Sequence, residues 1–239
     1  MRTRYVDQVS TRTEQVYEEL RRELLDLNGD FEPGQRLRLL DLAERFDASQ
    51  SVIREALTRL AEQGLLVATP QRGFSVRELS VADLADLTRT RVQVETLALR
   101  QAVEHGDVTW ESAVVAAHHT LERTPVSDGA GHFNEDWSAA HASFHQALLA
   151  GCASPRLEGI VTALRDSAEL YRRWYWALTH DHARDIAGEH RKLRDYAVAH
   201  KAEPAVKVLT EHIERAPREL IAYTRRHNLN APPPRNPGR

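Results

Sequence analysis

The sequence predicts a mainly α-helical protein, with a winged helix-turn-helix at its N-terminal end followed by an all-α helical bundle. Apolar runs of strand type occur only before residue 78, whereas helical periodicity continues from residue 81 to residue 226. The 239 residues are enough for two domains of ordinary size, each with its own core. We expect these domains at residues 11–78 and 79–227, between a disordered segment at 1–10 and a Pro-rich tail at 228–239.

The first domain is expected to begin with a helix that packs behind the helix-turn-helix. Thr11 and Glu14 have the spacing of a capping box, which marks a helix start. A stripe of apolar residues follows and stops at Asn28-Gly29; its members are Val16, Leu20, Leu24 and Leu27.

Residues 49–64 have the pattern of an amphipathic helix. Ser49 is a suitable N-cap, and Gly64 stands where a left-handed C-terminal cap belongs. Apolar side chains recur between them at helical spacing, at Val52, Ala56, Leu57 and Leu60. One face of the helix is therefore expected in the core and the other free. The early part of the free face carries hydrogen-bonding side chains, those of Ser49, Gln50, Ser51 and Arg54.

The neighbouring segments decide what this helix does, because most amphipathic helices only pack a core. A short helix is expected at residues 39–46, and residues 47–49 form a tight turn into the next helix, as in a helix-turn-helix. Strand-type runs at 65–69 and 74–77, joined by residues 70–73, then complete a winged helix-turn-helix.

At these residues the chain resembles the GntR family of bacterial transcription regulators. The shared pattern comprises Pro33-Gly34, Asp41-Leu42-Ala43, residues 49–57, Leu60, Gly64-Leu65 and Arg72-Gly73. The resemblance implies that the third helix faces the major groove of DNA and that the wing reaches the backbone or the minor groove. The residues concerned are Ser49, Gln50, Ser51, Arg54, Arg72 and Gly73.

One position departs from the family pattern. The family usually has arginine directly after the cap serine, and this chain has Gln50. Arginine favours guanine and glutamine favours adenine, so we expect an operator that differs from the commonest type.

Charge gives the chain no general attraction to nucleic acid. The net charge is −3, and residues 1–77 contain 12 Arg against 13 Asp and Glu. Affinity for DNA must therefore depend on the local placement of arginines and on dimerisation, so a homodimer on a palindromic double-stranded operator is expected.

The remaining composition indicates a cytoplasmic protein. The single cysteine, Cys152, excludes an intrachain disulfide and is expected to be buried. The N-terminus has no apolar signal region, and no run of residues approaches the length of a membrane span.

The second domain is predicted to be entirely helical. Ser80 and Asp83 form a second capping box, and no strand signal follows them. Helices are expected at residues 81–104, 110–122, 133–150, 155–178, 183–200 and 204–226. Such a series predicts a helical bundle.

All 12 histidines lie beyond residue 104, in this second domain. His141 and His145 are four residues apart on one expected helix, so their side chains share a face within reach of one ion. His190 and His212 lie on two later helices, and ligands that project inward from several helices of a bundle can form a metal site. Spacing alone is weak support, because twelve histidines allow many accidental pairs.

The bundle, from about Leu84 to His212, is similar to the FCD domain, the effector domain of the FadR subgroup of GntR regulators. His145, His190 and His212 match the three metal-binding histidines of that domain in order and approximate spacing. The domain commonly has aspartate four residues before the first of them, where this chain has His141.

We expect His141 to replace that aspartate, so that four histidines bind one divalent transition metal ion, zinc or nickel. The alternative is that His141 only fills space and the ion is weakly held or lost. Four neutral imidazoles would leave the ion at its full charge of about +2, which favours an anionic effector.

Arg91 and Glu95 match an arginine and a glutamate of the first FCD helix. In the family this arginine often contacts a carboxylate effector, so the resemblance implies that Arg91 binds one here. The alternative is that Arg91 is a solvated or ion-paired helix residue.

Other features of the bundle are assigned structural roles. The aromatic residues Tyr171, Trp174, Tyr175 and Trp176 are expected in the core. The histidines at positions 118, 119, 180 and 182 are expected at helix ends or on the surface.

The sequence is therefore interpreted as a transcription regulator, a repressor and not an enzyme, whose DNA affinity is controlled by a small carboxylate bound beside a metal ion. Two alternatives stay open. Three histidines with open coordination positions would also suit a metal-dependent hydrolase with a DNA-binding appendage, although no acidic residue has the spacing of a general base. A constitutive DNA-binding protein with an inert dimerisation bundle would leave the histidines without an ion.

Overall fold

The structure is a computed structural model, and it describes residues 11–26, 29–78, 80–127, 133–179 and 184–227. These residues divide into two compact units, one before and one after Leu79. The expected disordered N-terminus and Pro-rich tail lie outside the described residues, as do Leu27, His180 and His182. The mainly α-helical fold with a small sheet is confirmed.

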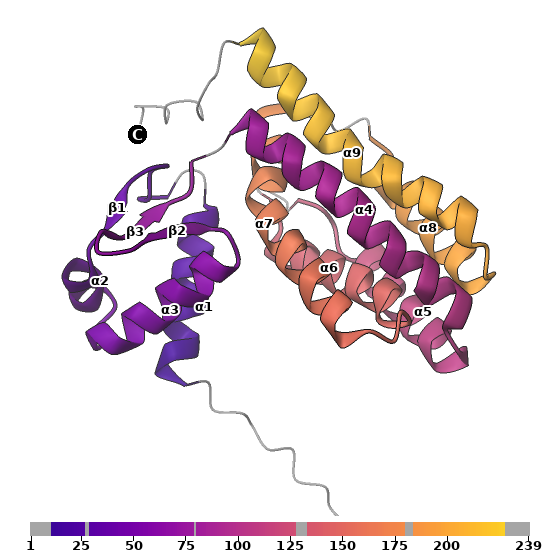
Figure 1. The fold of residues 1–239 in the computed structure, drawn as a ribbon, viewed down its shortest axis with the longest axis horizontal. Coiled ribbons are helices and arrows are strands. Elements are labelled where there is room, and N and C mark those ends of the chain that lie inside the picture. The colour runs from indigo at the N-terminus through magenta and orange to yellow at the C-terminus, as the bar shows by residue number, and fades with distance from the viewer. Residues whose placement is uncertain (1–10, 27–28, 79, 128–132, 180–183, 228–239) are drawn as a thin grey trace, which may run out of the picture. The chain divides into compact units, whose positions relative to one another are not determined.

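The first unit is a winged helix-turn-helix with a three-stranded sheet (Figure 1). Its elements are α1 (Arg12–Leu25), β1 (Arg36–Leu37), α2 (Leu39–Arg45), α3 (Gln50–Glu62), β2 (Leu66–Thr69) and β3 (Gly73–Val76). The strands lie in the order β1-β3-β2 and both pairings are antiparallel. The sequence did not predict β1, because two residues are too few to show an alternating pattern.

Helix α1 begins where the capping residues predict and packs against α3. The Thr11 hydroxyl accepts a hydrogen bond from the backbone N–H of Glu14. Two polar contacts join α1 to α3: Tyr17 donates to the Gln63 side chain at 2.8 Å, and Arg59 pairs with Glu14 at 2.8 Å. The helix ends at Leu25, earlier than the predicted stop at Asn28-Gly29.

Helix α3 has the predicted caps, and its buried face differs at one residue. Ser49 caps the first turn through the N–H of Val52, and Gly64 adopts the left-handed conformation with φ of 75°. The buried residues are Ile53, Ala56, Leu57 and Leu60. The prediction of Val52 was wrong, because the face is centred on Ile53 and leaves Val52 only half-buried.

The second unit is an all-helical bundle (Figure 1). Its helices are α4 (Val81–His105), α5 (Val108–Arg123), α6 (Glu135–Ala150), α7 (Pro155–Thr179), α8 (Ile186–Val198) and α9 (Ala202–Arg226). Ser80 caps α4 through the N–H of Asp83, as predicted. None of the helices in the described residues is long and apolar enough to cross a membrane.

The core of the bundle takes large side chains from most of its helices. Leu99, Val114, Phe144, Leu193 and Leu209 come from five different helices and are at most 1% exposed. Burial of each such side chain contributes about 1.5–3 kcal/mol, so this core fixes the helices that carry the histidines. Cys152 is also buried, as expected.

His118 does not lie on the surface, so that prediction was wrong. Its ring is only 2% exposed and packs edge-on against Phe144 at 5.4 Å between centroids. Arg194 of α8 lies 3.1 Å from the Nδ1 atom of His118 and satisfies it with a hydrogen bond. His118 is thus a hydrogen-bonded core residue.

Candidate DNA-binding surface and metal centre

The predicted DNA-reading residues all lie on the surface of the first unit. Gln50, Ser51 and Arg54 are exposed on the first two turns of α3. Ser49 is also exposed, but its hydroxyl already caps the helix and lies 2.8 Å from the Ser51 hydroxyl. Gln50 and Arg54 are therefore the side chains with most freedom to bind a partner.

Arg54 differs from the other arginines of the helix-turn-helix because it has no ion pair with any described residue. Arg45 pairs with Glu23 at 2.8 Å, and Arg59 pairs with Glu14 at the same distance. An arginine without a counter-ion can neutralise a phosphate or bind a guanine without first losing a partner.

The wing turn presents a second exposed arginine. Arg72 lies between two residues with positive φ, Gln71 at 61° and Gly73 at 82°. A Cβ atom at Gly73 would meet no atom within 4 Å, so glycine is needed there for its backbone conformation and not for space. Arg36 of β1, paired with Ser75 of β3, adds an exposed arginine that the sequence reasoning missed.

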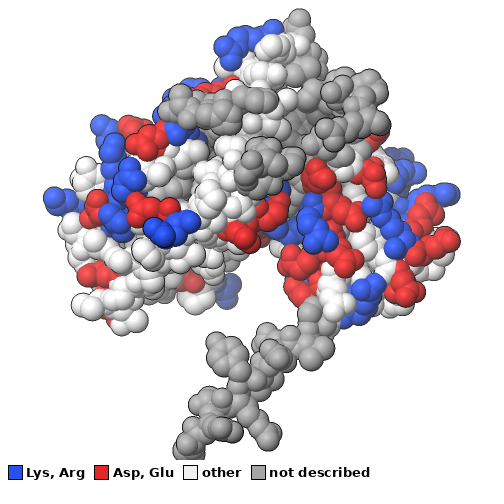
Figure 2. Space-filling model, turned by 180° about the vertical axis from the view of Figure 1, so that it is seen from behind, with Lys and Arg blue, Asp and Glu red and all other residues white. Residues whose placement is uncertain are grey.

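Charge over the surface is mixed. Lys and Arg side chains are interspersed with Asp and Glu over the face in view (Figure 2). This agrees with the net charge of −3, and it means that DNA binding must depend on a few placed arginines.

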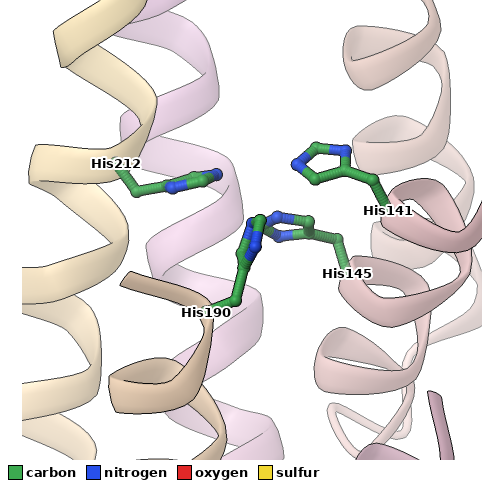
Figure 3. Close-up of side chains that lie close together, drawn as sticks. All are labelled: His141, His145, His190 and His212. Atoms are coloured by element: carbon green, nitrogen blue, oxygen red, sulfur yellow. The ribbon is translucent and has the colours of Figure 1, made fainter. Parts of the chain in front are cut away.

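The four predicted histidines lie together inside the bundle and point toward one another (Figure 3). His141 and His145 come from α6, His190 from α8 and His212 from α9. Their potential ligand atoms all lie within 4.8 Å of one another. The first three rings are at most 5% exposed, and the side chain of His212 is 10% exposed.

The cluster fits a transition metal ion in its donor atoms. The Nε2 atoms of His145 and His190 are buried and have no hydrogen-bond partner, an arrangement that an ion would satisfy. Zinc–nitrogen bonds of about 2.0–2.1 Å keep two ligands within about 4.2 Å. The observed spread of at most 4.8 Å is close to this limit, so the four side chains are near enough to share one ion once they adjust.

A carboxylate orients His212 toward the cluster. Glu189 Oε2 lies 2.7 Å from the Nδ1 atom of His212, and Arg184 holds Glu189 with bonds of 2.6 and 3.0 Å. This fixes the proton on Nδ1 and leaves the Nε2 lone pair for a metal. Burial raises the pKa of Glu189, but hydrogen bonds from His212 and Arg184 outweigh it and lower that pKa to about 2.

His141 has the opposite kind of partner. The guanidinium of Arg172 lies 3.0 Å from its Nδ1 atom and can only donate, so the ring proton is on Nε2. Ligation through Nε2 therefore requires that Arg172 release this bond. The ring is otherwise held by Trp137, on which it stacks at 4.8 Å between centroids.

The environment keeps the histidines neutral. Burial lowers the pKa of His141, His145 and His190 well below the usual value, and neighbouring positive charge, first that of Arg172 for His141, lowers it further. Burial also lowers the pKa of His212, although Glu189 opposes this. Neutral imidazole is the form that binds metal.

A cavity adjoins the cluster and is lined by both His141 and His212. Arg91 also lines it and donates through Nε to Glu95 at 2.7 Å; Arg165 bonds the other oxygen of Glu95 at 3.0 Å. Glu95 is completely buried. Arg91 is thus ion-paired, as in the alternative interpretation of the sequence, and it also lies on a cavity wall.

Three of the four aromatic residues assigned to the core also line this cavity. They are Tyr171, Tyr175 and Trp176. Tyr171 and Tyr175 are 5% exposed and buried, as predicted, whereas Trp176 is only half-buried, so the prediction of a core position was wrong for Trp176. Trp174 is 5% exposed and is a core residue, as predicted.

Comparison with known proteins identifies both units. Residues 12–76 match the model of the bacterial regulatory proteins of the gntR family, and residues 86–215 match the FCD domain. The chain belongs to the GntR family. The predicted family and FCD domain are thereby confirmed.

Relatives cover most of this GntR regulator. BphR of Paraburkholderia xenovorans, an uncharacterized HTH-type transcriptional regulator, is 38% identical over 84% of this chain and 82% of its own. The transcriptional repressor GlaR of Escherichia coli is 28% identical over 78% of this chain and 86% of its own. McbR/YncC of E. coli has the same fold, with a TM-score of 0.68, 22% identity, and coverage of 89% of this chain and 98% of its own.

These matches show a transcription regulator with a GntR DNA-binding domain and an FCD domain. GntR regulators bind DNA, typically as dimers, and FCD domains commonly bind metal ions; here the four-histidine cluster could hold one.

Sequence reasoning missed the partners that surround the histidines. Arg165 and Arg172 of α7, and Arg184, reach the site from segments distant from His141 in sequence. Their spacing on their own segments is ordinary, so no local signal could have found them. The exception is Glu189, which directly precedes His190.

Proposed function

We propose that this GntR regulator binds operator DNA as a homodimer and that a small carboxylate, bound beside a divalent metal ion in the FCD domain, controls its DNA affinity. The observation that carries the proposal is the buried cluster of four histidines on the wall of a cavity that also presents Arg91. Two of these imidazoles, His145 and His190, have buried nitrogens without a hydrogen-bond partner, which is costly unless they bind something.

The DNA-contacting residues are those on α3 and the wing. Gln50, Ser51 and Arg54 face the base edges in the major groove, with Ser49 at the helix end, and Arg72 and Gly73 approach the backbone or minor groove. Their exposure, and the absence of an ion pair at Arg54 among the described residues, support this assignment. Gln50 directs preference toward adenine at one position.

The metal is zinc or nickel, held by His145, His190 and His212, with His141 as a fourth ligand in place of the usual aspartate. The orphaned Nε2 atoms and the Glu189 contact support the first three. His141 ligates after Arg172 releases its Nδ1 atom. Imidazole suits these ions, and manganese is disfavoured because it prefers carboxylate. When bound, the ion supplies a positive anchor for an anionic effector.

Arg91 binds the effector carboxylate. Its Nε atom is committed to Glu95, and its terminal nitrogens have no hydrogen bond to any described residue. A guanidinium edge in that state matches a carboxylate.

The regulator acts as a cytoplasmic dimeric repressor of the FadR subgroup. The FCD match supports the subgroup, and the mixed charge of the first unit supports the dimer, because one head with few unpaired arginines has little affinity alone.

We also propose that the domain does not catalyse a reaction. The nearest carboxylate to the cluster, Glu189, bonds His212 and Arg184, and its pKa of about 2 makes it a poor general base.

Metal analysis of full-length protein purified without a His tag tests the site. About one equivalent of zinc or nickel is expected. Less than about a tenth of an equivalent, unchanged after incubation with either ion, would overturn the metal site. If the His141→Ala variant retains a full equivalent of metal, His141 is not a ligand.

Operator binding tests the regulatory function. Sites selected from random duplexes are titrated at fixed salt with metal-loaded protein, with and without a panel of organic acids. A palindromic site, a dimer by light scattering and at least one acid that shifts DNA affinity are expected. If none of the acids changes the affinity for DNA, the protein is a constitutive DNA-binding protein.

A further inference from the structure

The charged and imidazole side chains of the Arg91 cavity are gathered at one end. Arg172 contacts His141 and Arg184 contacts His212, so these four side chains lie together around the histidine cluster. Arg91 lines the same cavity from α4.

The opposite end is apolar along two helices. On α4, Leu84 lies seven residues before Arg91, about 10 Å along the helix axis. On α9, Leu220 lies eight residues after His212, about 12 Å along the axis. Both leucines line the cavity and are 3% exposed, and Leu87 and Trp176 add to the same wall.

The hydroxyl groups of the wall are occupied by other partners. Tyr171 donates to Asp83 at 2.7 Å, and Tyr175 donates to Glu219 at 2.8 Å. Thr88 donates to the carbonyl of Leu84 at 2.7 Å. These residues therefore present ring faces and a methyl group to the cavity, and a hydroxylated ligand would find few partners among them.

The polar end of the cavity is positively charged and suits a carboxylate, and an ion bound by the histidines would add to that charge. Arg172 pairs with Glu169, and Arg184 pairs with Glu189. Arg91 and Arg165 share the single carboxylate of Glu95, which leaves excess positive charge on the cavity side. The cavity is small, with a volume of about 80 Å³, so the part of the ligand that it encloses is compact.

We infer that the effector is a monocarboxylic acid with a compact apolar body, such as a short branched-chain acid, and that the cavity rejects dicarboxylates and sugar acids. This rests on the proposed function, in which Arg91 binds the effector carboxylate. The apolar body fills the space between α4 and α9 that Leu84 and Leu220 line. A second carboxylate would be buried there without a partner among the residues that the structure describes.

A matched pair of acids tests the inference. In 4-methylpentanoate a terminal isopropyl group occupies the place of the second carboxylate of succinate, with nearly the same shape. Binding of each to the zinc-loaded full-length protein is measured by calorimetry, with gluconate as the hydroxylated acid. We expect 4-methylpentanoate to bind at least about tenfold more tightly than the other two acids. In Arg91→Gln the heat of its binding should be no greater than that of injecting buffer.

A charge placed in the apolar wall should reverse the preference. Leu87 is half-buried, so the lysine of Leu87→Lys can reach solvent from the folded protein and offer its charge to a second carboxylate. Succinate should then bind more tightly than 4-methylpentanoate. The matched control is Leu97→Lys on the same helix, at a residue that is 49% exposed and outside the cavity wall, and it should keep the wild-type order.

The outcomes separate this inference from the proposed function. Succinate or gluconate binding as tightly as 4-methylpentanoate, and dependent on Arg91, would overturn the apolar preference and leave carboxylate control intact. No binding by any of the acids, with operator affinity unchanged by all of them, would overturn both.

Discussion

The first unit of this regulator carries its candidate functional side chains outside its core, and the second unit carries them inside its core. In the first unit Gln50, Arg54 and Arg72 are exposed, and none belongs to the buried set that holds α1 to α3. In the FCD unit His141, His145 and His190 are buried among the apolar side chains of the bundle. Function can therefore change independently of stability in the first unit, whereas in the second the two are coupled.

The coupling arises from unsatisfied polar groups. Each buried imidazole without a partner costs about 1–3 kcal/mol, and a bound metal ion would remove this cost. The following predictions use pH, metal and single substitutions to separate the two units, from the largest expected effect to the smallest.

The stability of the metal-free FCD unit should fall steeply below pH 6.5. The pKa values of His141, His145 and His190 are lowered in the folded state, so the unfolded chain binds more protons as pH drops through its own value of about 6.5. These three groups give a slope of up to about 4 kcal/mol per pH unit, and the lowered pKa values of His118 and His212 add to it. Denaturation of chelator-treated protein at pH 7, 6 and 5 measures it, followed by tryptophan fluorescence.

All four tryptophans lie beyond residue 104, so the fluorescence reports the FCD unit alone. Glu189 has a lowered pKa in the folded state, so its contribution to stability is lost only as pH falls below its ordinary pKa of 4.5. Between pH 7 and 5 the change in stability therefore comes from the histidines. His200, whose pKa is raised by hydrogen bonds with Glu111 and the Val103 carbonyl, acts in the opposite direction. His190→Leu should reduce the slope by up to about 1.4 kcal/mol per pH unit, and a flat profile from pH 7 to 5 would contradict the coupling.

Zinc should stabilise the FCD unit and leave the first unit unchanged. At one hundred times its dissociation constant a ligand that binds only the folded state contributes about 2.7 kcal/mol. His145→Ala should abolish this gain. The control is His118→Ala, which also removes a buried histidine but one outside the cluster, so it should lower stability and keep the response to zinc. If zinc stabilises both variants equally, the histidine cluster is not the metal site.

The same contrast explains what could be predicted from the sequence. Caps such as Thr11, Ser49 and Ser80 act on backbone groups three residues away, so local spacing placed the helix starts. Strand β1 depends on its pairing with β3, far along the chain, and gave no local signal. Val52 and Ile53 are adjacent and both apolar, and only packing decides which is buried.

Inside the FCD unit the sequence could provide the histidines but not their surroundings. Resemblance to the family placed His145, His190 and His212 in order. The partners Arg172 and Glu189 meet His141 and His212 only through the packing of different helices. His118 was misplaced for the same reason, because its burial depends on side chains from α6 and α8.

Arg54→Ala should weaken operator binding by roughly 1–3 kcal/mol and leave unfolding of both units unchanged. Arg54 is exposed and forms no ion pair with the described residues, so its loss removes no contact within the protein. Arg59→Ala is the matched control on the same helix. Arg59 pairs with Glu14 and lies over the Tyr17 ring at 3.9 Å. Its loss should therefore lower the stability of the first unit and leave the DNA affinity of the folded protein unchanged. Salt-controlled titrations with an unchanged affinity for Arg54→Ala would refute its role.

Arg72→Ala should have the smallest effect, about 1 kcal/mol or less. A flexible arginine on the exposed wing that contacts a phosphate contributes charge but no sequence information. The slope of log affinity against log salt should therefore fall by about one, and operator and mismatched duplexes should be weakened equally. Competition titrations at three salt concentrations measure both quantities. A loss confined to particular base pairs would instead place Arg72 in the minor groove as a reader of sequence. In either case the unfolding curve should match that of the wild type. Arg72 is exposed and lies outside the core, so its removal should not change the free energy of unfolding, whereas substitution of a buried histidine should.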